Sequence, residues 1–254
     1  MLRGDGAFEV MRIHQGEIFF LARHLVRLAH SAARLELTLP DLTRLRNFIL
    51  ETAAAWPSDT EGMLRLVCSR GRAGTDIATV YCAVTELGPE TARFRRDGVR
   101  LCTGASGFSA EARASAPWLL GGVKSLSYAV HMAGARWAAR NGADDLLWTT
   151  TAGQILETTG FSIVWIDGRR LCTVPADTGV VAGTTAGALL AKAGELGLAP
   201  AERMVTVNDL TKSDGVWATG SLSGVVAVRS IDRRTMPDSP LIGQARSLLG
   251  YPAE

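Results

Sequence analysis

The order of strand-like and helix-like patterns constrains the fold of this chain more than any other feature. Residues 7–21 alternate apolar and polar side chains around a turn at 14–17, which is typical of a β-hairpin. Apolar positions then recur at helical spacing over 24–37 and 40–55, and Pro40 suits the first turn of the second helix. Strands are predicted next, at residues 62–69, 77–84 and 99–103. This succession indicates an α+β fold.

The second half of the chain is separated from the first by residues 104–122. This segment is rich in glycine, alanine and serine and predicts a loop or interdomain linker. A helix is expected over 125–141, with Gly142 as its C-cap. The other predicted elements are strands at 145–150, 160–166, 170–173, 204–207, 215–219 and 225–230, and helices at 184–196, at 208–212 and in the tail.

Composition and charge exclude several classes of protein. A chain of 254 residues, 47% of them hydrophobic, is long enough to bury a sizeable core. The 27 basic and 25 acidic residues give a net charge of +2, which provides no electrostatic reason to expect nucleic acid or a membrane surface as partner. Apolar runs are too short for a membrane span and no signal peptide is visible, so a soluble protein is expected. The cysteine usage described next predicts a cytoplasmic location.

The four cysteines predict neither a metal site nor a disulfide framework. They are Cys68, Cys82, Cys102 and Cys172, and none is spaced as C-x-x-C. Each lies in an apolar, strand-like stretch, which favours reduced, buried thiols.

Lysine is scarce, so chemistry that needs an amine has few candidates. The three lysines are Lys124, Lys192 and Lys212. Lys192 lies in a predicted helix and Lys212 in a polar turn, whereas Lys124 follows a flexible apolar loop, 121–123. An apolar setting lowers the pKa of an amine and favours Schiff-base chemistry. On local features alone, an exposed lysine at a helix start is the alternative; the P-loop pattern is not met.

Three further segments carry candidate binding groups. Glu157 lies among apolar and hydroxyl residues, where it is either the partner of a buried cation or a surface residue at a strand end. Residues 183–185 open a predicted helix and residues 219–224 join two predicted strands, and both are rich in glycine and hydroxyl groups. Free backbone N–H groups at such positions can bind phosphate, although threonine is also a common N-cap.

Taken in order, these segments resemble the class IV aminotransferases, the fold-type IV pyridoxal-phosphate enzymes. The matching stretches are 4–10, 24–28 with 31–32, 124–128, 142–145, 156–157, 183–185, and 220–221 ahead of 229–232. The resemblance implies an N-terminal α/β domain over 1–106, a linker over 107–120, and a C-terminal cofactor-binding domain over 121–254. The larger C-terminal domain is expected to carry a mixed, barrel-like sheet. The family also implies a homodimer.

The resemblance assigns roles to individual residues. Lys124 resembles the lysine that forms a Schiff base with pyridoxal phosphate and later carries protons. Glu157 resembles the carboxylate that faces the pyridine nitrogen, which keeps the ring cationic. The remaining cofactor ligands implied are Arg27, Thr184, Thr185 and Ser221 at the phosphate and Tyr128, through a one-residue gap, near the 3′-oxygen.

Departures from the family pattern bear on the reaction. Members usually have a further strand before the segment that begins at Gly4, so either the start of this sequence is misassigned or the first domain lacks that strand. Ala186, Ser162 and Val10 stand where many members have arginine, asparagine and, in branched-chain enzymes, glycine.

These departures count against a standard branched-chain aminotransferase. The sequence favours a lyase that converts 4-amino-4-deoxychorismate, a small-molecule amine, to 4-aminobenzoate and pyruvate in folate synthesis. The alternative is an aminotransferase acting on D-amino or branched-chain amino acids. A third interpretation is a family member that binds the cofactor without turnover, or a binding module. The joint presence of Lys124, Glu157 and Arg27 counts against it.

Overall fold

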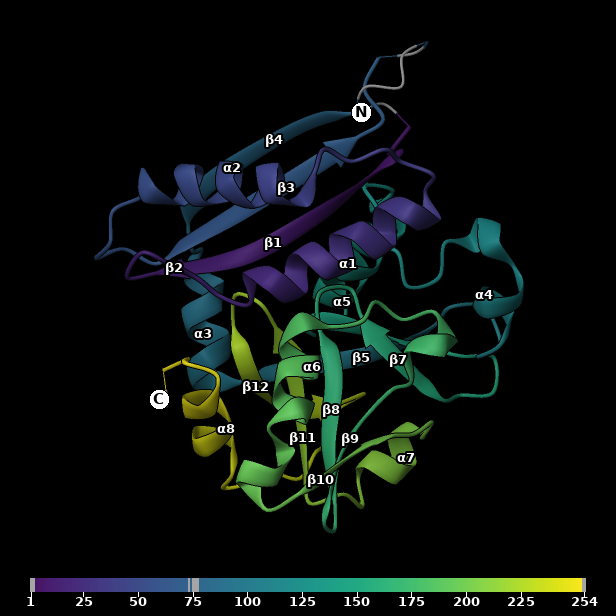
Figure 1. Ribbon diagram of the computed structural model, residues 1–254. Helices are drawn as coiled ribbons and strands as arrows, with labels where there is room; N and C mark the ends of the chain where they lie inside the picture. The colour runs from purple at the N-terminus through teal and green to yellow at the C-terminus, as the bar shows by residue number, and fades with distance from the viewer. Residues whose placement is uncertain (1–2, 73, 75–77, 253–254) are drawn as a thin grey trace. The chain divides into compact units, whose positions relative to one another are not determined.

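The computed structural model describes residues 3–72, 74 and 78–252 (Figure 1). Its backbone contacts divide the chain into two compact units. The amino-terminal unit comprises Met1–Gly88 and Val123–Tyr128, and the carboxy-terminal unit comprises Pro89–Gly122 and Ala129–Glu254. This division differs from the boundaries expected at 106 and 121. The strand expected at 99–103 pairs within the sheet of the second unit, and residues 123–128 pair with the first.

The amino-terminal unit is an antiparallel sheet with helices on one face. Its strands are β1 (Gly6–His14), β2 (Glu17–Ile18), β3 (Gly62–Ser69) and β4 (Thr79–Glu86), in the order β2-β1-β3-β4. Helices α1 (Leu21–Arg34) and α2 (Leu42–Ala54) cover one face of this sheet (Figure 1). Alternate residues of β1 and β3, such as Met11 and Leu66, form one core with Leu28 and Ile49 of the helices.

Three details of this unit differ from the sequence prediction. The second strand of the hairpin is short, because Phe20 adopts a left-handed conformation (φ 55°) and α1 begins at the next residue. Helix α2 begins after Asp41 rather than at Pro40, because the Asp41 carboxylate accepts hydrogen bonds from the N–H groups of Thr43 and Arg44. The strand predicted at 77–84 lies at Thr79–Glu86, and residue 77 is outside the described residues.

The carboxy-terminal unit is built on a mixed sheet with the order β10-β9-β8-β11-β12-β5-β6-β7, and β13 lies beside β12. Its strands are β5 (Val99–Ala105), β6 (Asp145–Thr149), β7 (Ile155–Thr158), β8 (Ser162–Asp167), β9 (Arg170–Thr173), β10 (Ala199–Glu202), β11 (Gly215–Gly220), β12 (Gly224–Ile231) and β13 (Arg234–Thr235). Residues from β5 through β12, among them Leu101, Trp165 and Val226, share one core. The sheet therefore curls around that core, as the fold class predicts.

Helices flank this sheet. They are α3 (Pro89–Asp97), α4 (Ala112–Ser115), α5 (Ala129–Arg140), α6 (Thr184–Ala191), α7 (Val207–Leu210) and α8 (Ile242–Leu248), with 3₁₀ turns η1 (Pro117–Leu119), η2 (Ala176–Thr178) and η3 (Ala193–Leu196). Helices α3 and α8 pack beside β12, α5 packs against β6, and α6 packs against β11.

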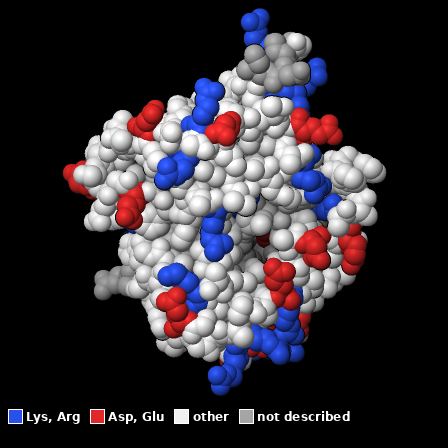
Figure 2. Space-filling view, in the orientation of Figure 1, with Lys and Arg blue, Asp and Glu red and all other residues white. Residues whose placement is uncertain are grey.

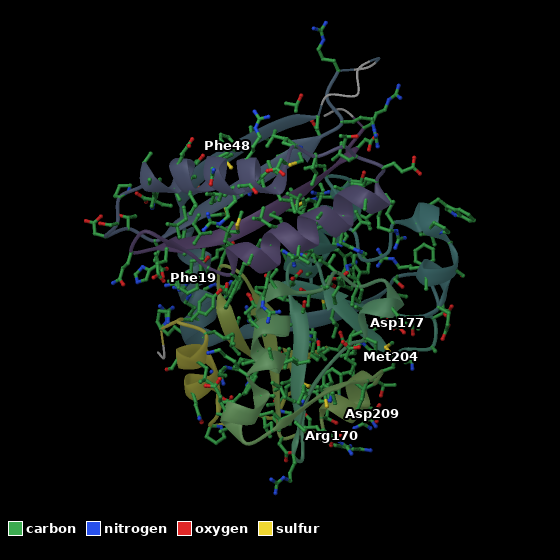
Figure 3. All side chains as sticks on the ribbon, viewed as in Figure 1. Phe19, Phe48, Arg170, Asp177, Met204 and Asp209 are labelled. Atoms are coloured by element: carbon green, nitrogen blue, oxygen red, sulfur yellow. The ribbon has the colours of Figure 1, made fainter. Side chains whose placement is uncertain are left out.

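Several predicted boundaries in this unit are wrong. The helix expected over 125–141 begins only at Ala129, and the helix expected over 184–196 divides into α6 and η3. The strand expected at 204–207 lies earlier, as β10, because Thr206 and Asp209 form a capping box that starts α7 (Asp209 is labelled in Figure 3). Helix α3 and strand β7 were not predicted. Segment 104–122 contains the end of β5, α4 and η1 as well as loop.

The sequence predicts that the four cysteines are buried thiols. All four cysteines are free, and three of them are buried, while Cys82 is half-buried. Burial raises the pKa of Cys68 to about 12 and that of Cys82 to about 11.

Acidic and basic side chains are interspersed over the face shown in Figure 2. Across residues 3–72, 74 and 78–252, no helix combines the length and the apolar character that crossing a membrane requires.

Candidate active site

Lys124 lies in an extended segment beside β1, not at the start of a helix. Ser125 forms a β-bridge with Ala7, the Phe8 N–H donates to Lys124 O (3.1 Å), and the Leu126 N–H donates to Gly6 O (2.9 Å). The Lys124 N–H donates to Ser31 Oγ (3.1 Å), and Ser31 is fully buried on α1. These bonds explain why the helix begins only at Ala129, and they fix the backbone of the lysine.

Two aromatic rings surround the amine of Lys124. Its Nζ lies 4.5 Å from the centroid of the Phe8 ring and 5.9 Å from that of Tyr128. The two rings are perpendicular, with centroids 5.5 Å apart. Rings at these distances attract a cation and also shield it from water on their side. Tyr128 therefore lies beside Lys124, and its role at the 3′-oxygen stays a prediction.

A buried charged group lies next to this lysine segment, on β1 and α1. Glu9 Oε1 accepts a hydrogen bond from Arg27 Nε (2.9 Å), and Glu9 Oε2 accepts one from Arg27 Nη2 (2.6 Å). His24 Nδ1 lies 2.6 Å from the same Oε2. Glu9 and His24 are almost completely buried, and Arg27 is 9% exposed. The carboxylate thus receives a bidentate guanidinium and an imidazole at once.

The pKa values of this group follow from its geometry. Burial opposes ionisation of Glu9, but the charge and hydrogen bonds of Arg27, together with His24, outweigh it and lower the pKa of Glu9 to about 2. Burial also lowers the pKa of His24, and the positive charges of Arg27 and Lys124 act in the same direction against the attraction of Glu9. Near neutral pH the group therefore consists of an ionised Glu9, a charged Arg27 and a neutral His24 that donates its Nδ1–H.

Arg27 was predicted from the resemblance to bind the cofactor phosphate. In this unit its Nε and Nη2 donate to the carboxylate of Glu9. The assignment of Arg27 to the cofactor phosphate stays a prediction.

The carboxy-terminal unit brings the predicted hydroxyl residues together. Thr184 and Thr185 form the first turn of α6, which begins after Gly183 without a side-chain cap. Thr184 Oγ1 lies 3.2 Å from Ser221 Oγ, in the turn between β11 and β12. Thr185 is 1% exposed, and its Oγ1 has no hydrogen-bond partner among the described residues. First-turn N–H groups have no acceptor within a helix, so the first turn of α6 provides several hydrogen-bond donors for an anion.

Glu157 lies near the end of β7 and is half-buried. Its Oε2 accepts a hydrogen bond from the Val181 N–H (3.1 Å), which holds the carboxylate in one direction. It borders a cavity of about 110 Å³ whose wall is mainly apolar, with Val174, Val180 and Leu190 among the lining residues. Charges interact more strongly in surroundings of low polarity, so a fixed carboxylate here suits a cationic ligand group.

Sequence reasoning gave no role to Glu9, His24 or Val181. A signal for the first two exists: Glu9 falls at an inward position of the β1 alternation, and His24 and Arg27 are three residues apart on one helix face. An acid on an apolar face predicts a buried pair. The backbone donor at Val181 has no sequence signal. The described residues contain no cluster of three or more histidine, cysteine or acidic side chains suited to a metal ion.

The sequence of this chain is similar to those of known proteins. The family model for class IV amino-transferases matches residues 6–231. A Mycobacterium tuberculosis protein named bifunctional aminodeoxychorismate lyase / D-amino acid transaminase is 36% identical over 249 residues, which cover 94% of this chain and 86% of that protein.

Solved structures agree with the family model. A hypothetical aminotransferase from M. tuberculosis, solved in a form with bound pyridoxal phosphate (PLP), superposes with a TM-score of 0.93 at 35% identity, covering 98% of this chain and 89% of that one. Its form with α-ketoglutarate and pyridoxamine phosphate (PMP) gives a TM-score of 0.92 with the same identity and coverage. A fold IV transaminase from Curtobacterium pusillum gives 0.91 at 32% identity, with 98% and 87% coverage.

Proposed function

Because the chain belongs to the class IV aminotransferase family of pyridoxal-phosphate enzymes, we propose that it is a lyase that converts 4-amino-4-deoxychorismate to 4-aminobenzoate and pyruvate. One observation supports this reaction: the M. tuberculosis relative, 36% identical over 94% of this chain, is named an aminodeoxychorismate lyase as well as a D-amino acid transaminase, so its name supports the lyase together with the second candidate below. The proposal includes a role in folate synthesis and a cytoplasmic location, both of which rest on the sequence expectation.

The residues present fit the cofactor. The orphaned Thr185 hydroxyl and the first-turn N–H groups of α6 suit a phosphate, and Ser221 adds a hydroxyl beside them. Glu157, fixed by the Val181 N–H, suits the pyridine nitrogen. When bound, PLP supplies an electron sink for the carbon that bears the substrate amine.

Lys124 is the group we propose to move the proton. Its backbone is fixed by bonds to Phe8 and Ser31, while its Nζ lies over the Phe8 ring. A lysine held in this way can take the proton from the amine-bearing carbon and return one later in the reaction. In the lyase reaction, the enolpyruvyl group then leaves as pyruvate and the product ring becomes aromatic.

A second candidate is transamination of a D-amino acid. It is favoured by the M. tuberculosis structure solved with α-ketoglutarate and PMP, which is 35% identical to this chain. Both reactions begin with the same proton removal by Lys124 and differ in what happens to the electrons afterwards. The residues described above serve both, so substrate tests decide between them.

The direct test is to supply the PLP-saturated protein with 4-amino-4-deoxychorismate and measure both products. We expect 4-aminobenzoate and pyruvate in equal amounts, and no product from Lys124→Ala. A protein that shows the yellow absorbance of lysine-bound cofactor but forms no 4-aminobenzoate contradicts the lyase. If that protein deaminates D-alanine with α-ketoglutarate, the second candidate replaces the first.

We also propose that the chain forms a homodimer. Helix α5 exposes Val130 (65%) and Trp137 (42%), which are seven residues apart and thus on one helix face. Trp118, which is 79% exposed, adds a large apolar side chain from η1. Exposed apolar side chains of this size are typical of protein interfaces. Light scattering should give twice the 27.0 kDa chain mass, and Trp137→Glu should lower it.

A further inference from the structure

The turn between β11 and β12 is held on its carbonyl side by buried side chains from other elements. Tyr251 Oη donates to Ser221 O (2.7 Å), and Arg95 Nη2 donates to Leu222 O (2.6 Å). Arg246 Nε donates to Val225 O (2.7 Å), at the start of β12. Tyr251, Arg95 and Arg246, named the backing cluster here, are each at most 9% exposed.

The members of the backing cluster also contact one another. Arg246 Nη2 donates to Arg95 O (2.7 Å), which ties α8 to α3 on the flank of β12 (Figure 1). The Arg95 guanidinium lies 6.0 Å from the centroid of the Tyr251 ring. The ring also packs on Gly224, whose φ is +74°; a Cβ there would lie 2.5 Å from Tyr251 Cγ. Only glycine allows this close approach.

Holding the carbonyls of a turn also directs its N–H groups. A trans peptide is planar, so its N–H points opposite to its C=O. The bond to Ser221 O therefore orients the Leu222 N–H, and the bond to Leu222 O orients the Ser223 N–H, both away from the backing cluster. The side chain of Ser221 meets Thr184 at the first turn of α6, so this turn borders the proposed phosphate site.

We infer that Tyr251 and Arg95 are positioning residues for the cofactor phosphate, which they serve by fixing the 221–224 turn and its donors. This inference rests on the phosphate site named in the proposed function. It gives a role to helix α3, which carries Arg95, and to the segment after α8, which carries Tyr251. Neither segment contains a candidate residue from the sequence analysis. The buried positive charges of Arg95 and Arg246 favour a dianion at the turn as well.

If Tyr251 positions the phosphate donors, its substitution should affect the binding of ligands that carry the phosphate more than the binding of ligands that lack it. Pyridoxal has the ring, the 3′-oxygen and the aldehyde of PLP but no phosphate, so it lacks only the group that the 221–224 turn is proposed to bind. Loss of the Tyr251 hydroxyl should weaken PLP binding and leave pyridoxal binding nearly unchanged. General loosening of the fold would weaken both.

The experiment titrates the cofactor-free, full-length protein with PLP and with pyridoxal, following the yellow absorbance that each gives with Lys124. The variant is Tyr251→Phe, which keeps the ring that packs on Gly224. Tyr81→Phe, at a 38% exposed position on β4, is the matched control, and Thr185→Val reports on the phosphate site. We expect Tyr251→Phe to lower the PLP-to-pyridoxal affinity ratio about threefold to tenfold, and Tyr81→Phe to leave it unchanged.

The outcomes separate two kinds of failure. If Thr185→Val lowers the ratio and Tyr251→Phe does not, the positioning role is wrong while the phosphate site stands. Equal weakening of both ligands by Tyr251→Phe also overturns that role. If neither variant changes the ratio, the phosphate lies elsewhere and both proposals fail. Should Tyr251→Phe not fold, Arg95→Lys, which keeps the charge but shortens the reach to Leu222 O, is measured in the same way with the same expected drop.

Discussion

The two units handle charge in different ways. In the amino-terminal unit, Glu9 is buried against Arg27 and His24, so a charged group is satisfied by another charged group within the unit. In the carboxy-terminal unit, the first turn of α6 offers hydroxyl and N–H donors, and the Thr185 hydroxyl has no acceptor or donor among the described residues. The first arrangement pairs charges inside the protein, whereas the second is the place where we propose that the cofactor phosphate binds.

This difference separates residues that stabilise the fold from residues that we propose bind a ligand. Breaking a buried ion pair leaves an uncompensated charge and destabilises the protein. Removing a buried hydroxyl that has no hydrogen-bond partner removes an unfavourable desolvation free energy and stabilises the protein instead. The two classes therefore respond with opposite signs to substitution in the cofactor-free protein, and the following predictions use that contrast.

Lys124→Ala should produce the largest effect on the reaction. We expect the rate of 4-aminobenzoate formation, or of D-alanine deamination, to fall by about a thousandfold or more, because the proposed reaction uses the Lys124 amine to hold the cofactor and to move the proton. Lys192→Ala is the matched control, since Lys192 is on the surface and its Nζ donates to Leu248 O. A Lys124→Ala protein with a tenth of the normal rate would remove the lysine from the mechanism.

Glu9→Gln should cause the largest loss of folding stability. The substitution leaves the buried Arg27 guanidinium without its ionised partner, which costs about 3–5 kcal/mol. The free energy of unfolding, measured in urea without cofactor, checks this. Asp5→Asn is the control, because the Asp5–Arg70 pair is exposed and contributes about 1 kcal/mol or less. Similar losses for both variants would show that burial does not distinguish the two pairs.

Sequence patterns predicted the elements whose periodicity is strong. The strands at 62–69 and 170–173 were predicted to the residue, and the succession in the first half was predicted apart from α3. The failures have a common cause, which is pairing between distant segments. Residues 125–128 have helical spacing, but the bridge from Ser125 to Ala7 keeps them extended. No local pattern contains that information.

The candidate site shows the same limit. Residues that share a short motif, such as Thr184 and Thr185, were found because glycine and hydroxyl groups before a helix are a local signal. The hydrogen bond from the Val181 N–H to Glu157 joins residues 24 positions apart, and the bond from Tyr251 to Ser221 joins residues 30 apart. Such contacts depend on the tertiary fold, so sequence alone does not predict them.

The stability of the paired group should fall in acid in two stages. The pKa of His24 is lowered in the folded state, so the unfolded chain binds more protons as the pH falls below about 6.5 and stability decreases. The pKa of Glu9 is also lowered, to about 2, so its contribution is full above about 4.5 and is lost as the pH falls toward 2. Each step changes stability by at most about 1.4 kcal/mol per pH unit.

Urea unfolding of His24→Gln from pH 7 to pH 5 tests the first stage. We expect a smaller decrease in unfolding free energy over this range than in the unmodified protein, because the titrating group is gone. His30→Gln, at an exposed position on the same helix, should keep the original slope. An unchanged slope in His24→Gln would assign the acid sensitivity to other groups.

Thr185→Val should have the smallest effect and the most informative sign. Valine has nearly the shape of threonine, so the change removes a buried hydroxyl that has no partner among the described residues, and the cofactor-free protein should gain about 1 kcal/mol of stability. The same change should weaken PLP binding about threefold to tenfold. Thr178→Val is the control in the same unit, because the Thr178 hydroxyl donates to Pro175 O (2.7 Å), and we expect it to lose stability instead. Loss of stability in Thr185→Val would mean that its hydroxyl is satisfied without the phosphate, and the contrast between the two units would then not hold.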